Sequence, residues 1–234
     1  TGWMMYNGLV SALGVGATIV LYDGSVSFPE ADALLGVVAR EQVTHFGTSP
    51  AYLSYCEGAE LVPRERHDFG ALLRMLSTGS VLSERMVDYA LASIKQVPIE
   101  SISGGTDIVG CFVLGSPNQA VIRGRSPALS LGLDVRAAVT GPSGTQLLRA
   151  LSEGFVSGEL VCAAPFPSRP LGLWGDEDGS RFHAAYFAEH EGVWTHGDHL
   201  ELHADGSARI LGRSDGVLNI RGVRIEPGEI YRNV

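Results

Sequence analysis

Cysteine is scarce in this chain of 234 residues, which contains only Cys56, Cys111 and Cys162. The three stand far apart and have no paired spacing. That pattern argues against a disulfide framework and against a zinc knuckle. Cysteine usage of this kind is typical of a reducing compartment, so we expect the protein in the cytoplasm.

Positive charge is also in short supply, because 17 Lys and Arg face 26 Asp and Glu, for a net charge of −9 at pH 7. Nucleic acid and anionic membranes are normally met by a basic face, so this balance argues against both as general partners. A local basic cluster, formed by Arg213, Arg221, Arg224 and Arg232, is a candidate for binding an anionic ligand. Arginines scattered over a solvated surface explain it equally well.

No charged residue precedes Asp23, so residues 1–22 have the apolar length of a membrane span. Asn7 and four glycines interrupt this run, and it divides into a helix and a strand. We therefore expect no membrane span. The chain has no recognisable signal peptide and begins with threonine inside an expected helix, which leads us to expect an internal piece of a longer protein.

The first part of the chain alternates helices with strands. Apolar periodicity and capping residues predict helices over 2–13, 31–42, from 49 onward and over 83–96, and strands over 17–22, 43–48, 72–76 and 98–102. Such alternation forms parallel β-α-β units, whose ligands lie beyond the carboxyl ends of the strands.

The rest of the chain has a different rhythm, with short strands broken by glycine-containing turns. We therefore predict an α/β protein in three parts. Residues 1–113 form the parallel β-α-β half, residues 114–212 a small antiparallel β-barrel, and residues 213–234 a hinge and the start of a truncated C-terminal domain. The segment 141–156 carries extra apolar length for which the sequence offers no functional explanation.

Four short segments stand out, in the order Ser77-Thr-Gly-Ser80, Ser101-Ile-Ser-Gly-Gly-Thr-Asp107, Thr195-His-Gly-Asp198 and Gly212-Arg-Ser-Asp215. The first two follow expected strands. Glycine permits close approach of a ligand to the backbone, and exposed amides provide donors to an anion. Taken singly, each of these two loops is more often a plain connection between a strand and a helix.

Taken in order, the four segments resemble the signature of the adenylate-forming enzymes, the superfamily of acyl-CoA synthetases, luciferases and adenylation domains. This resemblance implies that the backbone of Thr78, Gly79 and Ser80 packs flat against the adenine of ATP. It also implies that the carboxylate of Asp198 accepts hydrogen bonds from both ribose hydroxyls, since a carboxylate offers two acceptor oxygens. Arg213 would reach the ribose and the neighbouring phosphate.

The same resemblance assigns roles to the second glycine loop. Its backbone at Gly104 and Gly105 and the hydroxyl of Thr106 would hold the α-phosphate and the reacting carboxylate. Asp107 would help to place Mg²⁺. Catalysis would then depend on fixed donors and a metal more than on a covalent nucleophile.

Near the C-terminus, Asp215 matches the pivot about which the small domain of these enzymes turns between two half-reactions. Arg224 matches an arginine that contacts phosphate, so together with Thr106 and Arg213 it is an expected catalytic residue. Arg221 and Gly222 match the segment that meets the pantetheine arm of coenzyme A, although serine is often found at the first of these positions.

Other stretches are similar to the acetoacetyl-CoA synthetase branch of the superfamily, and this similarity covers nearly the whole chain. They are Gly2-Trp-Met-Met-Tyr-Asn7, 103–108, 165–168, 185–187 and 192–194. The similarity implies that acetoacetate reacts with ATP to an acyl-adenylate, which the thiol of coenzyme A then captures. Related acetyl-CoA synthetases carry tryptophan at the position of Gly104, so glycine implies a deeper acyl cavity. Residues 3–6 would line that cavity or simply form the buried face of a helix.

The resemblance also implies features outside the printed sequence. A phosphate-binding loop should precede Thr1, and a lysine that orients the carboxylate should follow Val234. We therefore expect the chain by itself to bind nucleotide weakly and to be inactive, and robust acetoacetate-dependent exchange of ATP with pyrophosphate would refute this. The alternative hypothesis is a non-catalytic adenylate-binding module or remnant of the same fold.

The histidines and serines of the sequence raise two other kinds of site, a metal centre and a serine hydrolase. His190, His196, His199 and His203 are close in sequence and could together collect zinc or nickel. In a strand, however, residues 196 and 199 point to opposite faces. A serine hydrolase is not supported either, because the α/β half contains no Gly-x-Ser-x-Gly elbow.

Overall fold

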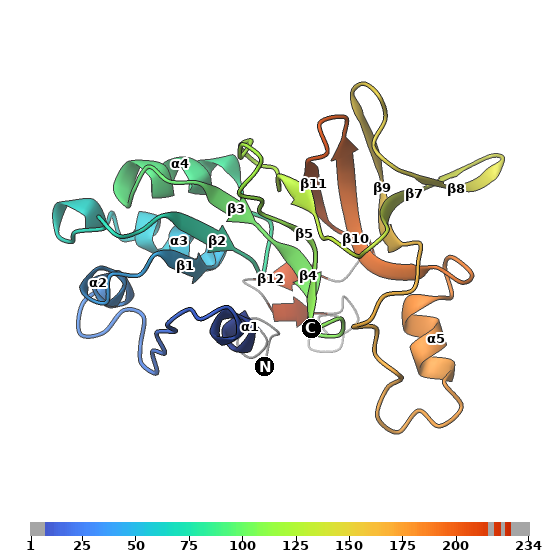
Figure 1. Ribbon diagram of the computed structural model, residues 1–234, viewed down its shortest axis with the longest axis horizontal. Coiled ribbons are helices and arrows are strands. Elements are labelled where there is room, and N and C mark those ends of the chain that lie inside the picture. The colour runs from blue at the N-terminus through green and yellow to red at the C-terminus, as the bar shows by residue number, and fades with distance from the viewer. Residues whose placement is uncertain (1–7, 215–217, 221–222, 226–234) are drawn as a thin grey trace, which may run out of the picture.

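The computed structural model describes residues 8–214, 218–220 and 223–225 (Figure 1). Its first half is built on a parallel sheet of three strands in the order β1-β2-β3. These strands are β1 (His45–Thr48), β2 (Arg74–Ser77) and β3 (Ile99–Ser101). The helices are α1 (Leu9–Gly14), α2 (Ala33–Arg40), α3 (Pro50–Gly58) and α4 (Glu84–Ser93), with a short 3-10 turn over Pro63–Glu65.

Local signals explain why these helices begin where they do. The side chain of Ser49 accepts a hydrogen bond from the Tyr52 amide at 3.2 Å, with Pro50 at the first helical position of α3. Ser83 caps α4 in the same way. Helices α2, α3 and α4 pack on the sheet through one buried cluster, whose fully buried members include Leu35, Leu53, Cys56, Met75 and Ala90.

The predicted strand over 17–22 is wrong, because the structure shows no strand there. Val20, Leu21 and Tyr22 are instead exposed. Apolar β-branched residues favour a strand only where a neighbouring strand supplies hydrogen bonds and a surface to pack on. Among the described residues, β1 pairs with β2 alone, and nothing pairs with 17–22.

The second half is antiparallel. A hairpin of β4 (Ser103–Gly105) and β5 (Gly110–Leu114) is extended by β6 (Ala128–Leu129). A larger sheet has the order β11-β10-β9-β7-β8. Its strands are β7 (Val135–Gly141), β8 (Gly144–Leu148), β9 (Phe155–Cys162), β10 (Trp194–His203) and β11 (Ala208–Arg213).

The expected barrel is not confirmed, because this larger sheet is open within the described part of the chain. β8 pairs only with β7, and β11 pairs only with β10. The segment 141–156, unexplained by sequence, contains the β7-β8 turn, β8 and the start of β9. What the structure supports is a mixed α/β fold with a parallel and an antiparallel part.

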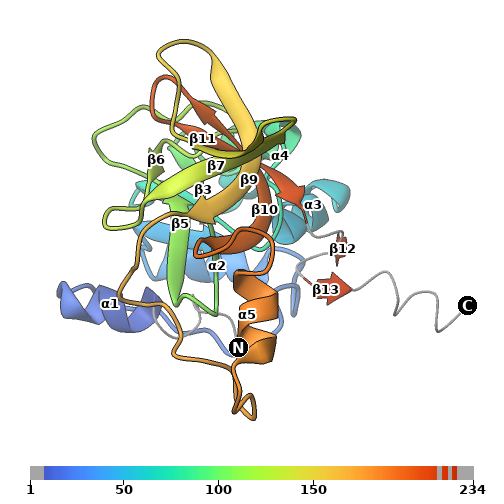
Figure 2. The same ribbon diagram turned by 90° about the vertical axis from the view of Figure 1, so that its right-hand side faces the viewer.

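Helix α5 (Ser180–Tyr186) covers one end of this sheet, beside the start of β10 (Figure 2). The rings of Tyr186 and Trp194 stack with their centroids 3.9 Å apart, and the Phe166 ring contacts Trp194 edge-on at a centroid distance of 5.5 Å. Trp194 is almost fully buried. This aromatic cluster anchors the start of the strand that leads to Asp198.

Near the C-terminus, β12 (Leu218–Ile220) and β13 (Val223–Ile225) form an antiparallel pair. The division of the chain at residues 113 and 212 stays a prediction. None of the described helices has the length and apolar character needed to cross a bilayer.

Candidate functional site

A cavity of about 1230 Å³ lies beyond the ends of β2 and β3 and is also lined by Asp198 of β10 and by several residues of β11. Segments far apart in the sequence line it. Among the lining residues are nine that the sequence singles out: Thr78, Gly79, Ser80, Gly104, Gly105, Thr106, Asp107, Asp198 and Arg213. Both glycine loops and the carboxylate-guanidinium pair therefore face one space.

The turn after β2 is held in an unusual backbone conformation. Gly79 has φ +98°, in the left-handed region where residues with a side chain are strained. The Thr78 amide donates to the Thr48 carbonyl at 3.2 Å, which ties this turn to the end of β1. The backbone of the turn is thus presented to the cavity without an intervening side chain at its centre.

The loop after β3 is packed tightly against its own hairpin. A Cβ built on Gly104 would lie 2.8 Å from the carbonyl carbon of Gly110, and closer still to the Gly110 oxygen and to Cys111 Cα. Real Cβ atoms do not show such contacts, so glycine is required by the approach of β4 to β5. Glycine at 104 thus has a packing reason of its own, while the deeper acyl cavity expected from this glycine stays a prediction.

The same loop carries Thr106 and Asp107 into the cavity wall. Asp107 Oδ1 accepts the Ile108 amide at 3.0 Å. Mg²⁺ is commonly held by one or two carboxylates together with the phosphates of a substrate. A single carboxylate on a cavity of this size fits such a metal, with the phosphates as its other ligands.

Asp198 and Arg213 are register partners across β10 and β11. Arg213 Nη1 donates to Asp198 Oδ1 at 3.1 Å and to the His196 carbonyl at 3.2 Å. Both side chains are close to nine-tenths buried. The pairing of β10 with β9 is interrupted between Thr195 and His199, and Asp198, which lies in this interruption, pairs with β11 and lines the cavity.

Sequence reasoning missed a third member of this group. Ser103 Oγ donates to Asp198 Oδ2 at 3.0 Å, so each carboxylate oxygen receives one hydrogen bond from the protein. His196 Nε2 lies 3.7 Å from Asp198 Oδ2, and the centroid of the His196 ring lies 4.7 Å from that of the Phe112 ring. Ser103 lies in the second glycine loop, 101–107, but nothing in the local sequence indicates a hydrogen-bond partner 95 residues away.

Comparison with known proteins agrees with this geometry. The family model for AMP-binding enzyme matches residues 2–167, well over half of the chain. The chain belongs to the AMP-binding enzyme family.

Relatives within the AMP-binding enzyme family are more specific. The chain is 44% identical to the acetoacetyl-coenzyme A synthetase of Rhizobium meliloti (strain 1021) and 42% identical to the acetoacetyl-CoA synthetase of Danio rerio, in both cases over its whole length. It covers 35% and 34% of those two proteins. The chain therefore spans about a third of the length of the curated relatives it matches.

Solved structures give the same picture. The acetoacetyl-CoA synthetase from Streptomyces lividans superposes with a TM-score of 0.77 at 42% identity, over 98% of this chain and 35% of that one. The anthranilate CoA ligase AuaEII, solved in complex with anthranoyl-AMP, gives a TM-score of 0.67 over 92% of this chain and 38% of its own. Its identity is 22%, so it supports the fold alone.

Several residues expected from the AMP-binding family resemblance cannot be placed. Asp215, Arg221 and Gly222 lie outside the described residues, as does the stretch 2–7 with the candidate acyl-pocket residues 3–6. Arg224 falls in β13, but its side chain is not described. Their roles stay predictions.

The four histidines do not come together as a metal cluster within the described ranges. His190 Nε2 lies 3.2 Å from Glu159 Oε2, His196 Nε2 lies 3.7 Å from Asp198 Oδ2, and His203 Nε2 lies 3.4 Å from Glu201 Oε2. One set of possible metal ligands is found there, Glu159, Glu189 and His190, whose donor atoms lie within 4.8 Å of one another. It contains one of the four histidines.

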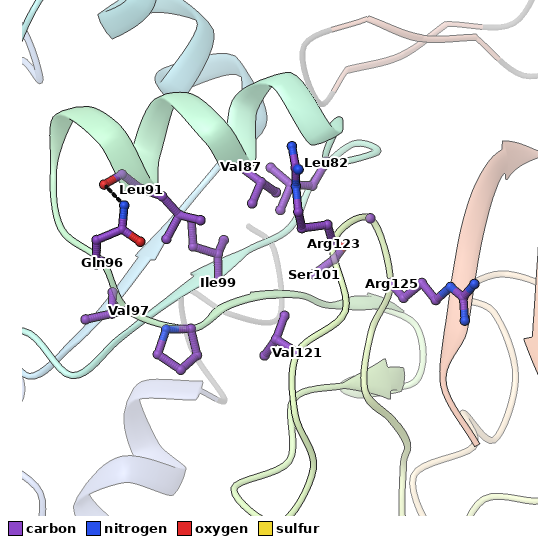
Figure 3. A pocket seen from close by; sticks show the side chains of 12 residues that line it. Leu82, Val87, Leu91, Gln96, Val97, Ile99, Ser101, Val121, Arg123 and Arg125 are labelled. Carbon is purple, nitrogen blue, oxygen red and sulfur yellow. Dashed lines mark hydrogen bonds between the residues drawn. The ribbon is translucent and has the colours of Figure 1, made fainter. Parts of the chain in front are cut away.

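A second, smaller cavity of about 360 Å³ lies beneath α4 (Figure 3). Aliphatic side chains make up most of its wall, and Gln96 donates to the Leu91 carbonyl at 2.9 Å beside it. Leu82, Ser101 and Gly124 line both cavities. Ser126 Oγ donates to the Ser101 carbonyl at 2.7 Å, which fixes the wall between them.

The thiol nearest the glycine loop is not an activated nucleophile. Burial raises the pKa of Cys111, although a hydrogen bond to Ser130 opposes the shift. A thiol with a raised pKa stays protonated at neutral pH. The chemistry that this site offers is therefore hydrogen bonding, charge stabilisation and metal placement.

Proposed function

We propose that this protein is an ATP-dependent acid-thiol ligase that converts acetoacetate to acetoacetyl-CoA. In the first step a carboxylate oxygen of acetoacetate attacks the α-phosphorus of ATP and pyrophosphate leaves. In the second step the thiol of coenzyme A attacks the acyl-adenylate carbonyl and AMP leaves. The observation that carries the proposal is that both glycine loops, Asp198 and Arg213 line one cavity.

The nucleotide would lie along the strand ends. The exposed backbone of Thr78, Gly79 and Ser80 offers a flat surface for adenine, because Gly79 has no side chain. The lone pairs of Asp198 that Ser103 and Arg213 do not use can accept the ribose hydroxyls. The cavity exceeds the usual range of small-molecule sites, so it has room for ATP together with a short acid.

The first step would take place beside the second loop. Thr106 and the backbone at Gly104 and Gly105 would hold the α-phosphate and the attacking carboxylate at a fixed separation. Arg213 would add positive charge near the phosphate. Mg²⁺, when bound with ATP at Asp107, supplies charge neutralisation on the phosphate oxygens.

The second step rests on residues whose side chains the structure does not describe. Arg221 and Gly222 would meet the pantetheine arm, Asp215 would be the hinge between the two half-reactions, and Arg224 would contact phosphate. Acetoacetate as the acid is supported by the names of relatives at 42–44% identity. The separate steric argument from Gly104 stays a prediction, because the packing of β4 against β5 also explains the glycine.

The experiment is acetoacetate-dependent exchange of pyrophosphate into ATP by the full-length protein. Asp198→Asn keeps the shape but removes the charge, and we expect it to raise KM for ATP by about tenfold or more, because hydrogen bonds to charged groups contribute about 1.5–3 kcal/mol. Glu201→Gln is the matched control. It makes the same chemical change on the same strand, outside the cavity lining.

Two results would contradict the proposal. Exchange of pyrophosphate into ATP that depends on another acid and not on acetoacetate would contradict acetoacetate as the substrate. Tight binding of an acyl-AMP analogue without any exchange would favour the alternative, a non-catalytic adenylate-binding module.

A further inference from the structure

Ser103 is placed to control the carboxylate of Asp198. The serine is the first residue of β4, and its hydroxyl donates to Asp198 Oδ2 at 3.0 Å. Arg213 donates to the other oxygen, Oδ1, at 3.1 Å. Ser103 and Asp198 both line the large cavity, and Asp198 is buried.

The backbone around Ser103 is fixed on both sides. The amide of the preceding residue, Ile102, donates to the Ser77 carbonyl at 2.8 Å. Ser103 pairs with Val113 of β5, and the register shifts directly after it. The following residue is Gly104, which is in tight contact with the β5 backbone. The hydroxyl is thus delivered to Asp198 from a site with little freedom to move.

A carboxylate held by one donor can rotate about its terminal bond, because torsions that end in an sp² carbon have broad minima. Two donors on different oxygens fix its plane. Each oxygen still has a second lone pair for a further donor. Ser103 and Arg213 together therefore leave Asp198 with two acceptor sites of defined direction.

We propose that Ser103 is a positioning residue, whose hydrogen bond fixes the plane of the Asp198 carboxylate for recognition of the ribose diol of ATP. This inference rests on the proposed function, since it takes Asp198 as the ribose acceptor. The opposite role would be competition, in which the serine hydroxyl occupies the lone pair that the ribose needs. The two roles predict opposite changes in affinity when the hydroxyl is removed.

The test compares ATP, 2′-deoxy-ATP and 3′-deoxy-ATP as substrates of the full-length wild-type and Ser103→Ala proteins. We expect KM for ATP to rise about 5- to 10-fold in the variant, with kcat changed less than about twofold. In the variant, KM for each deoxy substrate should rise less than KM for ATP, because each deoxy substrate lacks one of the hydroxyls that the carboxylate recognises. The wild-type preference for ATP over them should therefore shrink.

Two further variants sharpen the comparison. Ser103→Thr keeps the hydroxyl and should restore most of the preference for ATP. Ser207→Ala is the matched control, because Ser207 is a buried serine whose Oγ also donates to a carboxylate, Asp205 Oδ1 at 2.6 Å, and the residue is not part of the cavity lining. It should leave the preference unchanged.

Several results would overturn the inference. An equal rise in KM for all three nucleotides in Ser103→Ala would mean that Ser103 only supports the local structure. A lower KM for ATP in that variant would mean that the serine hydroxyl competes with the ribose. If the wild-type protein uses ATP but shows no preference over the deoxy forms, Asp198 is not the ribose acceptor. If no adenine nucleotide is used at all, the proposed function itself fails, together with the role of Ser103.

Discussion

Gly104 provides a sharp test of the site geometry, because one added methyl group has nowhere to go. In Gly104→Ala the new Cβ would lie 2.8 Å from the Gly110 carbonyl carbon and nearer to two other backbone atoms. Backbone cannot swing aside as a flexible side chain can, so β4 and β5 would have to separate. Overpacking of this kind typically costs 1–3 kcal/mol, and we expect the upper end, about 3 kcal/mol.

The assay is thermal or urea unfolding of the variant against wild type. For a protein of this size, about 3 kcal/mol corresponds to a fall in Tm of about 6–12 °C. Gly110→Ala is the control from the same hairpin, because its Cβ would lie 3.6 Å from the Ile108 carbonyl, which is an ordinary contact. That variant should stay within about 1 kcal/mol of wild type, since loss of glycine freedom in the unfolded chain partly offsets any strain. A Gly104→Ala protein as stable as wild type would refute the reasoning, because it would show that the contact with β5 does not require glycine.

Three further predictions concern stability and reactivity. Arg136 and Arg149 donate hydrogen bonds to Asp134 and lower its pKa. The stability that this carboxylate provides is therefore fully present above its unfolded pKa of about 3.9, and it is lost as the pH falls through the lower pKa of the folded state. Asp134→Asn should therefore cost about 1 kcal/mol at pH 7 and progressively less below about pH 4, and a gap in urea midpoint that persists at pH 2 would contradict this. Lys95 Nζ donates to three backbone carbonyls of the loop before β2 at 2.6–2.8 Å, so Lys95→Met should lower the free energy of unfolding by about 2 kcal/mol, and an unchanged urea midpoint would show that these bonds add nothing. Cys111, with its raised pKa, should react with iodoacetamide at pH 7 far more slowly than in the unfolded chain, and equal rates would show that the thiol is not protected.

The elements that sequence reasoning found are those with local causes. The strands β1, β2 and β3 and the helices α2, α3 and α4 were predicted within a few residues, because apolar periodicity and the caps Ser49 and Ser83 act within one or two turns. The failed strand over 17–22 and the unconfirmed barrel have non-local causes. Each depends on which distant strand pairs with an edge, and residue preferences do not encode that.

The features of the site can likewise be separated into those with local causes and those with non-local causes. That the two loops would share a cavity follows from the rule that ligands lie beyond the carboxyl ends of parallel strands. The contact between Ser103 and Asp198 could not be predicted, because it depends on the register of β4 and on the interruption in β10. The packing reason for glycine at 104 depends in the same way on how closely two strands approach.

The most direct test of the central idea is a crystal structure of the full-length protein with a non-hydrolysable acetoacetyl-AMP analogue. Our account predicts adenine against the turn at Gly79, both ribose hydroxyls on Asp198, and the phosphate beside Thr106. An analogue bound elsewhere, or one that occupies the cavity with its ribose away from Asp198, would contradict it.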